Sequence, residues 1–360
     1  MIHGLRAQRL LGALCLAIAT ACGSGPTEPD DTGFSPPPSN PDTIPLRQLA
    51  QQRGIRIGSA VDAGFRYTGS QGTLFRAKLA REFSMLTPEN DMKHASIHPA
   101  RDTYRFTSAD SLVSFAEANG MQVRGHTLVW HQQLASWLTN GTWTTAETRT
   151  LLDDHIRTVV DHYKGRLVAW DVVNEPFNDN GGMRSGFWFD RLGEAYIEQA
   201  FRAANVADPQ AKLFLVDYNI EGINAKSDSA YALVSRLLAR GVPVHGIALQ
   251  GHFQVGTVPP TLAANIARFA ALGLRIHIAE LDVRIQLPST TATLQQQAND
   301  YRDVFAACLT TTACEAVVAW GLTDRESWVP STFPGWGEPM LFTGSFDPKP
   351  AFFAIYQLLK

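Results

Sequence analysis

The chain has 360 residues, of which 45% are hydrophobic, so it can bury a large apolar core. Its formal net charge is −3, and the sequence therefore lacks the strongly basic field that attracts nucleic acid. We expect no nucleic-acid partner.

The first 21 residues have the pattern of an export signal. Arg6 and Arg9 precede the apolar run 10–21, which is too short for a permanent membrane span and ends in an Ala-x-Ala cleavage pattern. Cys22 follows directly, and two interpretations remain open. Ordinary cleavage would release a secreted protein. The placement of Cys22 also resembles a bacterial lipobox, which implies acylation of Cys22 and anchoring of a lipoprotein to the cell envelope.

Residues 22–45 are rich in Gly, Ser, Pro, Thr and Asp and contain Ser35-Pro36-Pro37-Pro38-Ser39. A segment of this composition cannot bury apolar surface, which predicts a disordered tether. The folded domain is then expected over residues 46–360.

From Leu46 onward, short apolar runs alternate with helical patterns, as in parallel sheets whose strands are buried on both faces. The predicted strands are Ile55–Ala60, Arg81–Thr87, Gln122–Val129, Leu167–Val173, Leu213–Asp217, Gly246–Gln250, Arg275–Leu281 and Ala316–Leu322. Between them, Thr144 and Glu147 form a capping-box pattern, and Gly241 ends an amphipathic stretch. This alternation predicts an α/β fold, the (β/α)8 TIM barrel, as a single catalytic domain. An open doubly wound sheet would favour a G-x-G-x-x-G loop after the first strand, and none is present.

Cysteine usage agrees with export. Beyond Cys15 and Cys22, the chain contains only Cys308 and Cys314, which are close in sequence. In an oxidising compartment we expect a disulfide between them. The sequence has no C-x-x-C metal pattern, and we expect no His/Cys cluster with zinc spacing and no metal.

Two carboxylates follow predicted strands directly. Asn174-Glu175-Pro176 ends the fourth strand, and Ala279-Glu280-Leu281-Asp282 ends the seventh. In a barrel, these ends share the face that carries active sites. Each Glu could be a member of a structural ion pair, but two facing carboxylates also suit glycoside hydrolysis, with retention or inversion set by their separation.

The residues Trp170-Asp171-Val172-Val173-Asn174-Glu175-Pro176 resemble the acid/base motif of glycoside hydrolase family 10, which comprises mainly endo-β-1,4-xylanases. Ile278-Ala279-Glu280-Leu281-Asp282 is similar to that family's nucleophile motif, with Ala279 in place of the usual Thr. The resemblance implies catalysis by Glu175 and Glu280, with retention by double displacement. Asp282 would support His252, which in turn would donate to Glu280.

Further motifs recur in the family's order: Thr87–Lys93 in the second strand, Arg124–Gln133 in the third, Leu249–His252 in the sixth and Trp320–Trp328 in the eighth. The resemblance implies a substrate-binding shell made of Glu89, Asn90, Lys93, His126, Trp130, Gln133, Asn174, Tyr218, Gln250, His252, Trp320 and Trp328. This sequence departs from the pattern at Asp91 (usually Glu), at His94 (commonly Trp) and at Val216 (commonly Asn).

The resemblance implies a retaining endo-β-1,4-xylanase that acts on plant cell-wall xylan, arabinoxylan and xylo-oligosaccharides without a cofactor. We expect a monomer. Two alternatives are a β-1,4-glucanase on a related barrel and a carbohydrate-binding protein that has lost turnover. The retained Glu175 and Glu280 disfavour the second alternative.

Overall fold

Parallel strands closed into a ring form the centre of the domain. The computed structural model describes residues 44–360, so the export signal, Cys22 and most of the tether lie outside the described residues. The ring runs in the order β8-β6-β5-β4-β3-β2-β1-β9, and β9 pairs with β8 to close it. Its strands are β1 (Arg56–Val61), β2 (Met85–Pro88), β3 (Gln122–Gly125), β4 (Ala169–Asn174), β5 (Lys212–Asp217), β6 (Gly246–Leu249), β8 (Arg275–Gln286) and β9 (Cys314–Ala319). The predicted TIM barrel is therefore confirmed.

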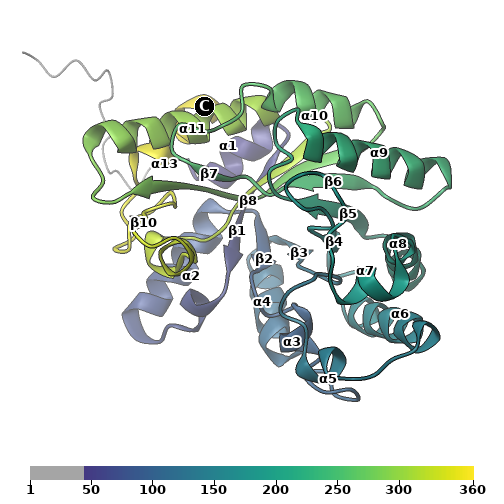
Figure 1. Ribbon diagram of the computed structural model, residues 1–360. Helices are drawn as coiled ribbons and strands as arrows, with labels where there is room; N and C mark the ends of the chain where they lie inside the picture. Colours follow the sequence, from purple (N-terminus) through teal and green to yellow (C-terminus); the bar gives the residue numbers. More distant parts are fainter. Residues whose placement is uncertain (1–43) are drawn as a thin grey trace, which may run out of the picture. The chain divides into compact units, whose positions relative to one another are not determined.

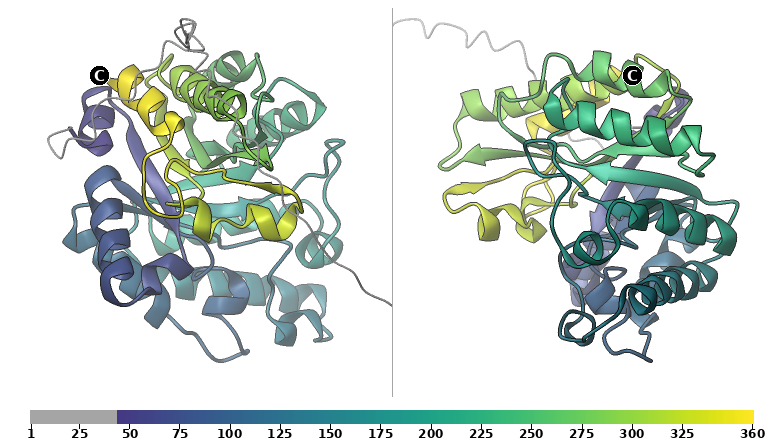
Figure 2. Two further views of the ribbon diagram at one scale, coloured as in Figure 1. Left: turned by 90° about the vertical axis from the view of Figure 1, so that its left-hand side faces the viewer. Right: turned by 45° about the vertical axis from the view of Figure 1, so that its right-hand side comes forward.

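Helices surround the ring from the outside (Figures 1 and 2). The longer ones are α2 (Gly69–Glu82), α4 (Thr107–Ala118), α6 (Thr145–His162), α8 (Ala195–Ala207), α9 (Ala225–Ala239), α10 (Leu262–Ala270), α11 (Thr291–Cys308) and α13 (Pro350–Leu359). Short elements complete the described chain: α1 (Leu46–Gln52), η1 (Ala63–Arg66), α3 (His94–Ile97), α5 (Ser136–Thr139), α7 (Phe187–Leu192), β7 (His252–Gln254), η2 (Asp324–Glu326), α12 (Val329–Thr332) and β10 (Trp336–Gly337).

Local sequence signals fix the start of several helices. The Thr144 hydroxyl oxygen accepts a hydrogen bond from the Glu147 backbone N–H, and the Glu147 carboxylate accepts one from the Thr144 backbone N–H. The predicted capping box therefore opens α6. Asn224 and Ser227 form the same motif at the start of α9. Apolar stripes of these helices, such as Leu152, Ile156 and Val159 in α6, pack against the strands.

Each predicted strand corresponds to one strand of the ring, and three of them differ from it by four residues or more at one end. The second begins only at Met85, because Arg81 and Glu82 complete α2 and Glu82 accepts the Leu46 backbone N–H. The third ends at Gly125, after which Val129 rejoins the sheet through a single bridge to Val173. The seventh, β8, continues past Leu281 to Gln286, because β7 and β10 pair with this extension.

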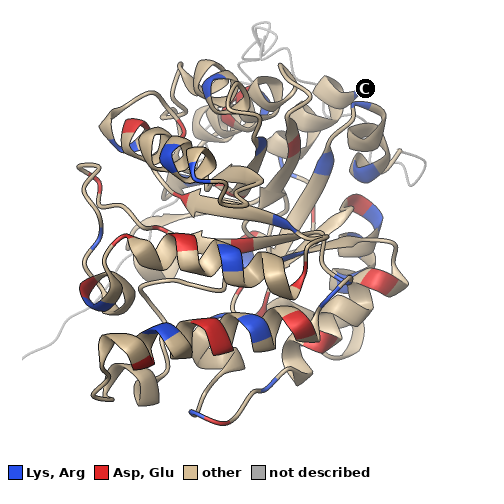
Figure 3. Cartoon of the chain, turned by 90° about the vertical axis from the view of Figure 1, so that its right-hand side faces the viewer, with Lys and Arg blue, Asp and Glu red and all other residues tan. Residues whose placement is uncertain are grey.

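Charged residues of both signs are interspersed along the outer helices on the face drawn in Figure 3. Within residues 44–360, no helix combines the length and the apolar content that crossing a membrane requires.

Cys308 and Cys314 form a disulfide. It joins the end of α11 to the first residue of β9. Because Cys314 begins its strand, the disulfide lies at the end of the barrel opposite the carboxyl ends of the strands.

We expect the double variant Cys308→Ser/Cys314→Ser to be less stable by about 2 kcal/mol, the loop-closure entropy of so short a loop. Urea unfolding measures this difference. Wild-type protein unfolded under reducing conditions should show the same loss, and kcat at 25 °C should be unchanged because the disulfide lies at the opposite end of the barrel. A double variant as stable as the oxidised protein would contradict the expectation.

Candidate active site

One cleft, with a volume of about 680 Å3, opens at the carboxyl ends of the strands. It is lined by both predicted catalytic residues, Glu175 and Glu280, and by the whole predicted substrate-binding shell: Glu89, Asn90, Lys93, His126, Trp130, Gln133, Asn174, Tyr218, Gln250, His252, Trp320 and Trp328. The structure therefore brings together residues from seven different strand ends and loops. The size suits several sugar rings.

The backbone positions the two carboxylates differently. Glu175 follows the last residue of β4 and has φ of 55°, a left-handed conformation that non-glycine residues rarely adopt. Its N–H donates to the Val216 carbonyl, so β5 holds it in place. Glu280 lies within β8 where the pairing with β9 shifts register, and only 4% of it is exposed. Strain and irregular pairing of this kind collect at functional sites.

His252 lies between two carboxylates. Its Nε2 donates to Glu280 Oε2 at 3.2 Å, and its Nδ1 donates to Asp282 Oδ2 at 2.9 Å. Burial lowers the pKa of His252, but Asp282 and Glu280 outweigh burial and raise this pKa to about 10. The imidazole is therefore a cation at neutral pH, and its positive charge lies beside the Glu280 carboxylate.

A separate set of side chains surrounds Glu175. Gln250 Nε2 donates to Glu175 Oε1 at 3.0 Å and to Asn174 Oδ1 at 3.2 Å. The Nδ1 atom of His131 lies 3.8 Å from the other carboxylate oxygen, and Arg184 Nε donates to the Glu175 carbonyl. Burial lowers the pKa of His131, against the opposing charge of Glu175. Neutral donors thus orient this carboxyl group, in contrast to the cation beside Glu280.

A chain of buried polar groups inside the barrel supports the cleft from below. His126 Nδ1 lies 2.9 Å from Asp171 Oδ2 and 3.9 Å from Glu280 Oε1, and Asp171 also pairs with Arg124. Burial raises the pKa of Asp171, but Arg124 and His126 outweigh it, and the net shift is downward. Asp171 is therefore a buried anion that fixes the His126 ring.

One end of the cleft contains side chains of the second-strand motif, Thr87–Lys93. Lys93 Nζ donates to Asn90 Oδ1 at 2.9 Å and lies 4.9 Å from the centre of the Trp130 ring. Burial raises the pKa of Glu89 to about 7, although Lys93 lowers it. Asn90 is held in turn by Asp62, to which it donates at 2.8 Å. These groups offer donors and acceptors to sugar hydroxyls.

Tyr218 stands on the other side of Glu175. Its hydroxyl accepts from Arg184 at 2.8 Å, and Lys226 Nζ lies 3.4 Å from the centre of its ring. Lys226 also pairs with Asp217 at 2.8 Å. Val216, where the family commonly has Asn, is fully buried and uses its backbone carbonyl rather than a side chain to hold Glu175.

Sequence reasoning missed several groups around the cleft. Those that contact the catalytic residues or their partners are Arg124, His131, Asp171 and Arg184, and further residues that line the cleft are Gln132, Asn219, Arg284, Thr332 and Phe333. Asp171 had a usable signal, because it is a carboxylate within a predicted buried strand, where such a group needs a partner. Arg184 and Phe333 come from loops, where no periodicity points to them.

Three histidines that the sequence pattern did not single out come together in the structure. His94, His98 and His155 are buried together, with one nitrogen of each within 4.8 Å of the others. His94 and His98 are four residues apart, a spacing visible in the sequence, but His155 comes from α6. These residues lie outside the cleft lining, apart from the chemistry of the two carboxylates.

Comparisons with known proteins agree with this geometry. The family model for glycosyl hydrolase family 10 matches residues 45–358. The chain belongs to this family. It is 43% identical to endo-1,4-beta-xylanase B of Thermotoga neapolitana, over 88% of this chain and 92% of that protein. It is 42% identical to endo-1,4-beta-xylanase A of Phanerodontia chrysosporium, over 87% and 76% respectively.

Solved structures give the same result. Xylanase 10B from Thermotoga petrophila RKU-1, in complex with xylobiose, matches with a TM-score of 0.86 and 45% identity, over 88% of this chain and 97% of that one. Native xylanase 10B from Thermotoga maritima also matches with a TM-score of 0.86 and 45% identity, covering 88% and 98%. This family 10 chain is therefore a glycoside hydrolase with the fold of these enzymes.

We expect Asp282→Asn to lower the pKa of the His252 imidazole by about 1 unit or more, because the carboxylate is the main group that raises it. A ring-nitrogen NMR titration of His252 measures the shift. The alkaline limb of the kcat/KM profile should move to lower pH, because His252 then loses its proton, and Glu280 its neighbouring cation, at a lower pH than in the wild type. Asp303→Asn, on the exposed face of α11, is the control and should change neither quantity. An unshifted His252 titration would contradict the expectation.

Proposed function

We propose that this protein is an exported endo-β-1,4-xylanase that cleaves internal bonds of xylan with retention, by double displacement. One observation carries the proposal: Glu280, held by the His252–Asp282 pair, and Glu175, held by neutral donors, line the same cleft. The names of the relatives, and the xylobiose bound in the matched Thermotoga petrophila structure, support xylan as the substrate.

In the first step, the Glu280 carboxylate attacks the anomeric carbon, and Glu175 donates its proton to the departing glycosidic oxygen. The charge of Glu280 disappears when the ester forms, which leaves His252 paired with Asp282 alone. This pair remains close to neutral overall, so no buried charge is left without a partner.

In the second step, Glu175 is a carboxylate and removes a proton from the water that attacks the ester. Glu280 departs and regains its contact with the His252 cation, which stabilises the leaving carboxylate. The amide of Asn174, next to Glu175, would bond the 2-hydroxyl of the sugar, a contact that strengthens in the transition state.

The remaining shell supports binding of a chain of pentoses. Glu89, Asn90 and Lys93 would take the hydroxyls on the glycone side, and Trp320 and Trp328 would pack against the ring at the reaction centre. Trp328 is held firmly, because its Nε1 donates to Asp282 at 2.8 Å. A rigid aromatic wall leaves little room for the hydroxymethyl group that distinguishes glucose from xylose.

Export is part of the proposal and rests on the sequence alone. The signal pattern of residues 1–21 and the two cysteines of the domain favour an oxidising compartment outside the cytoplasm. Acylation of Cys22 would anchor the enzyme to the cell envelope, and cleavage without acylation would release it. Mass spectrometry of the mature N-terminus distinguishes the two.

We expect Glu280→Ala to be inactive on xylan, because the variant lacks the nucleophile. Glu175→Ala should retain slow turnover of an aryl β-xylobioside, whose leaving group needs no proton, and azide should accelerate it by attacking the ester in place of water. The product would be β-xylobiosyl azide. Proton NMR of the first sugar anomer released by wild-type enzyme tests retention.

Glu117→Ala is the matched control, since this Glu forms a partly exposed ion pair with Arg166 on the outer surface. It should keep wild-type activity. Wild-type rates in either Glu280→Ala or Glu175→Ala would exclude these two residues as the catalytic pair. Release of the α-anomer first would exclude double displacement.

We expect kcat/KM on linear xylan to exceed that on carboxymethyl cellulose by about 10- to 200-fold. This is the usual discrimination of a closely fitting pocket against a substrate with one additional small group. Initial rates of reducing-sugar release measure this ratio. Comparable rates on both polymers would instead favour the alternative, a β-1,4-glucanase. Binding of xylo-oligosaccharides without turnover would favour a carbohydrate-binding protein.

A further inference from the structure

Three histidines are buried side by side outside the cleft. His94 opens α3, His98 follows the end of that helix, and His155 lies in the middle of α6. At most 5% of each is exposed. Their rings contact one another, with centroids 4.5 Å apart for His94 and His155 and 5.4 Å apart for His98 and His155. Buried imidazoles rarely gather in this way without a shared partner.

Burial keeps all three rings neutral. It lowers the pKa of His94 to about 3 and that of His98 below its usual value. It lowers the pKa of His155 well below its usual value. Neutral imidazole is the form in which histidine binds a metal ion, because one ring nitrogen then has a free lone pair.

The hydrogen bonds decide which lone pairs are free. His98 Nε2 lies 2.9 Å from the Arg101 carbonyl, which can only accept, so the hydrogen of His98 is on Nε2 and its Nδ1 has the lone pair. This Nδ1 faces Nδ1 of His155 at 3.2 Å. A backbone carbonyl on the outer nitrogen of a histidine is the usual support of a metal ligand.

Neither tautomer of His155 satisfies this arrangement. With its hydrogen on Nδ1, His155 can donate to His98, but its buried Nε2 is then an acceptor that meets no donor, and the Leu128 backbone beside the ring favours an N–H rather than a lone pair. With its hydrogen on Nε2, on the side away from His98, two lone pairs face each other at 3.2 Å. A cation between the two Nδ1 atoms removes both problems.

The spacing suits a transition-metal ion. Two imidazole nitrogens bound to one tetrahedral zinc ion at about 2.0–2.1 Å lie roughly 3.3–3.4 Å apart, close to the observed 3.2 Å. His94 completes the set. Its Nδ1 has a lone pair, because it accepts a long bond of 3.3 Å from the Ala135 N–H. A small side-chain movement would exchange that donor for a metal ion.

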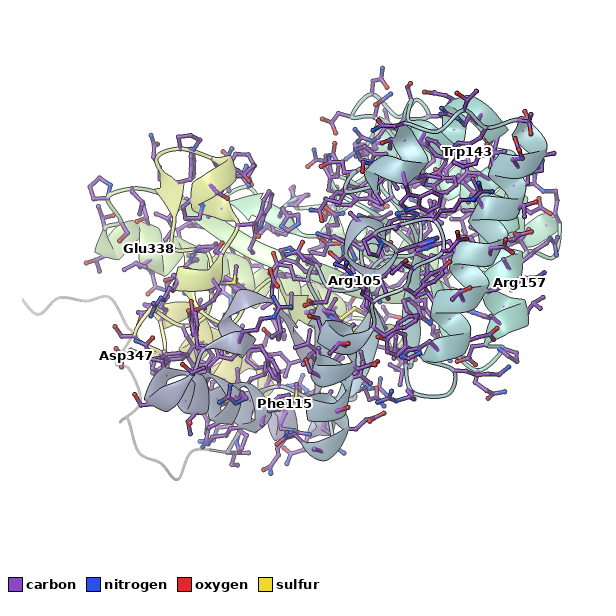
Figure 4. All side chains as sticks on the ribbon, turned by 90° about the horizontal axis from the view of Figure 1, so that it is seen from below. Arg105, Phe115, Trp143, Arg157, Glu338 and Asp347 are labelled. Carbon is purple, nitrogen blue, oxygen red and sulfur yellow. A yellow bond between two sulfur atoms is a disulfide. The ribbon has the colours of Figure 1, made fainter. Side chains whose placement is uncertain are left out.

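An entry path and a place for a fourth ligand lie next to His98. A hollow of about 370 Å3 is lined by His98 together with Asp102, Tyr104, Trp143, Glu147 and Asp154. Arg101 also lines this hollow, but the three carboxylates outweigh its one positive charge and would attract a cation, and water in the hollow could complete the coordination. Figure 4 shows Trp143, from the loop before α6, and Arg157, from α6 itself, on the other side of the molecule from Glu338 and Asp347.

We propose that His94, His98 and His155 form a binding site for one zinc ion, which joins α3 to α6. Imidazole ligands without thiolates suit zinc. Lys93 and Asn90 immediately precede α3, so the ion would also stiffen the loop that presents the glycone-side residues. The role is structural, because the histidines do not line the catalytic cleft.

The test uses the full-length protein without a histidine tag, stripped with EDTA and titrated with zinc. We expect one zinc per chain by elemental analysis, a Kd below about 1 µM, and a rise in Tm of about 4 °C when free zinc reaches 100 times its Kd. Less than one tenth of a zinc per chain under these conditions would overturn the proposal.

Two variants separate this site from the catalytic carboxylates, which can also attract zinc. His94→Phe keeps an aromatic ring against Trp137 and Trp188 but removes a ligand, and it should bind zinc at least about 100-fold more weakly. His162→Gln changes an exposed histidine of α6, the helix that also contains His155, and this variant should bind zinc as the wild type does. Equal binding by His94→Phe and wild type would refute the site.

X-ray absorption at the zinc edge of the wild-type protein does not depend on any variant being folded. Three imidazole ligands would support the proposal, and a shell of carboxylate and water oxygens would overturn it. Neither outcome depends on xylanase activity, so the zinc site and the proposed function can fail independently.

Discussion

One oxygen atom of Asp282 organises the reaction centre. Asp282 is fully buried, and its Oδ2 accepts hydrogen bonds both from His252 Nδ1 and from Trp328 Nε1. Through His252 it sets the charge beside Glu280, and through Trp328 it fixes an aromatic wall of the cleft. Burying a carboxylate without hydrogen-bond donors carries a large desolvation free energy. The fold supplies two such donors to Asp282. Catalytic and binding geometry therefore depend on the same group.

The barrel supplies those donors by extending its seventh parallel strand. β8 continues beyond Glu280 to Gln286 and pairs with β7, so that His252 lies directly opposite Asp282 in the sheet register. Arg124, Asp171 and His126 occupy the interior below. Buried charges of this kind are weak contributors to stability, because desolvation offsets most of their attraction. Their value here is orientation, since each ring and carboxyl group has one set of partners.

The barrel, which is confirmed, and the placement of Glu175 and Glu280 in one cleft could be predicted because both depend on simple patterns. Apolar runs mark strands buried on two faces, and a carboxylate at the end of such a run must face the cleft or find a counter-charge. The pairing of side chains was harder to predict. Gln250 lines the cleft, as expected of a substrate-binding residue, and it also donates to Glu175. His131 and Arg184 reach the same residue from loops. Such contacts depend on the approach of distant segments, which no local pattern encodes.

Two departures from the family pattern, Val216 and Ala279, have one physical explanation. Both side chains belong to a small apolar cluster inside the barrel, together with Ala169, Phe214 and Ala248. A polar residue at only one of these positions would leave a buried hydrogen-bonding group without a partner, which costs more than losing the bond itself. Replacing both polar groups by apolar ones avoids that cost. Glu175 loses nothing by the change, since the Val216 carbonyl, rather than a side chain, accepts its N–H. The backbone of β5 thus holds Glu175, the proposed acid/base residue, while the cluster that contains the Val216 and Ala279 side chains is apolar.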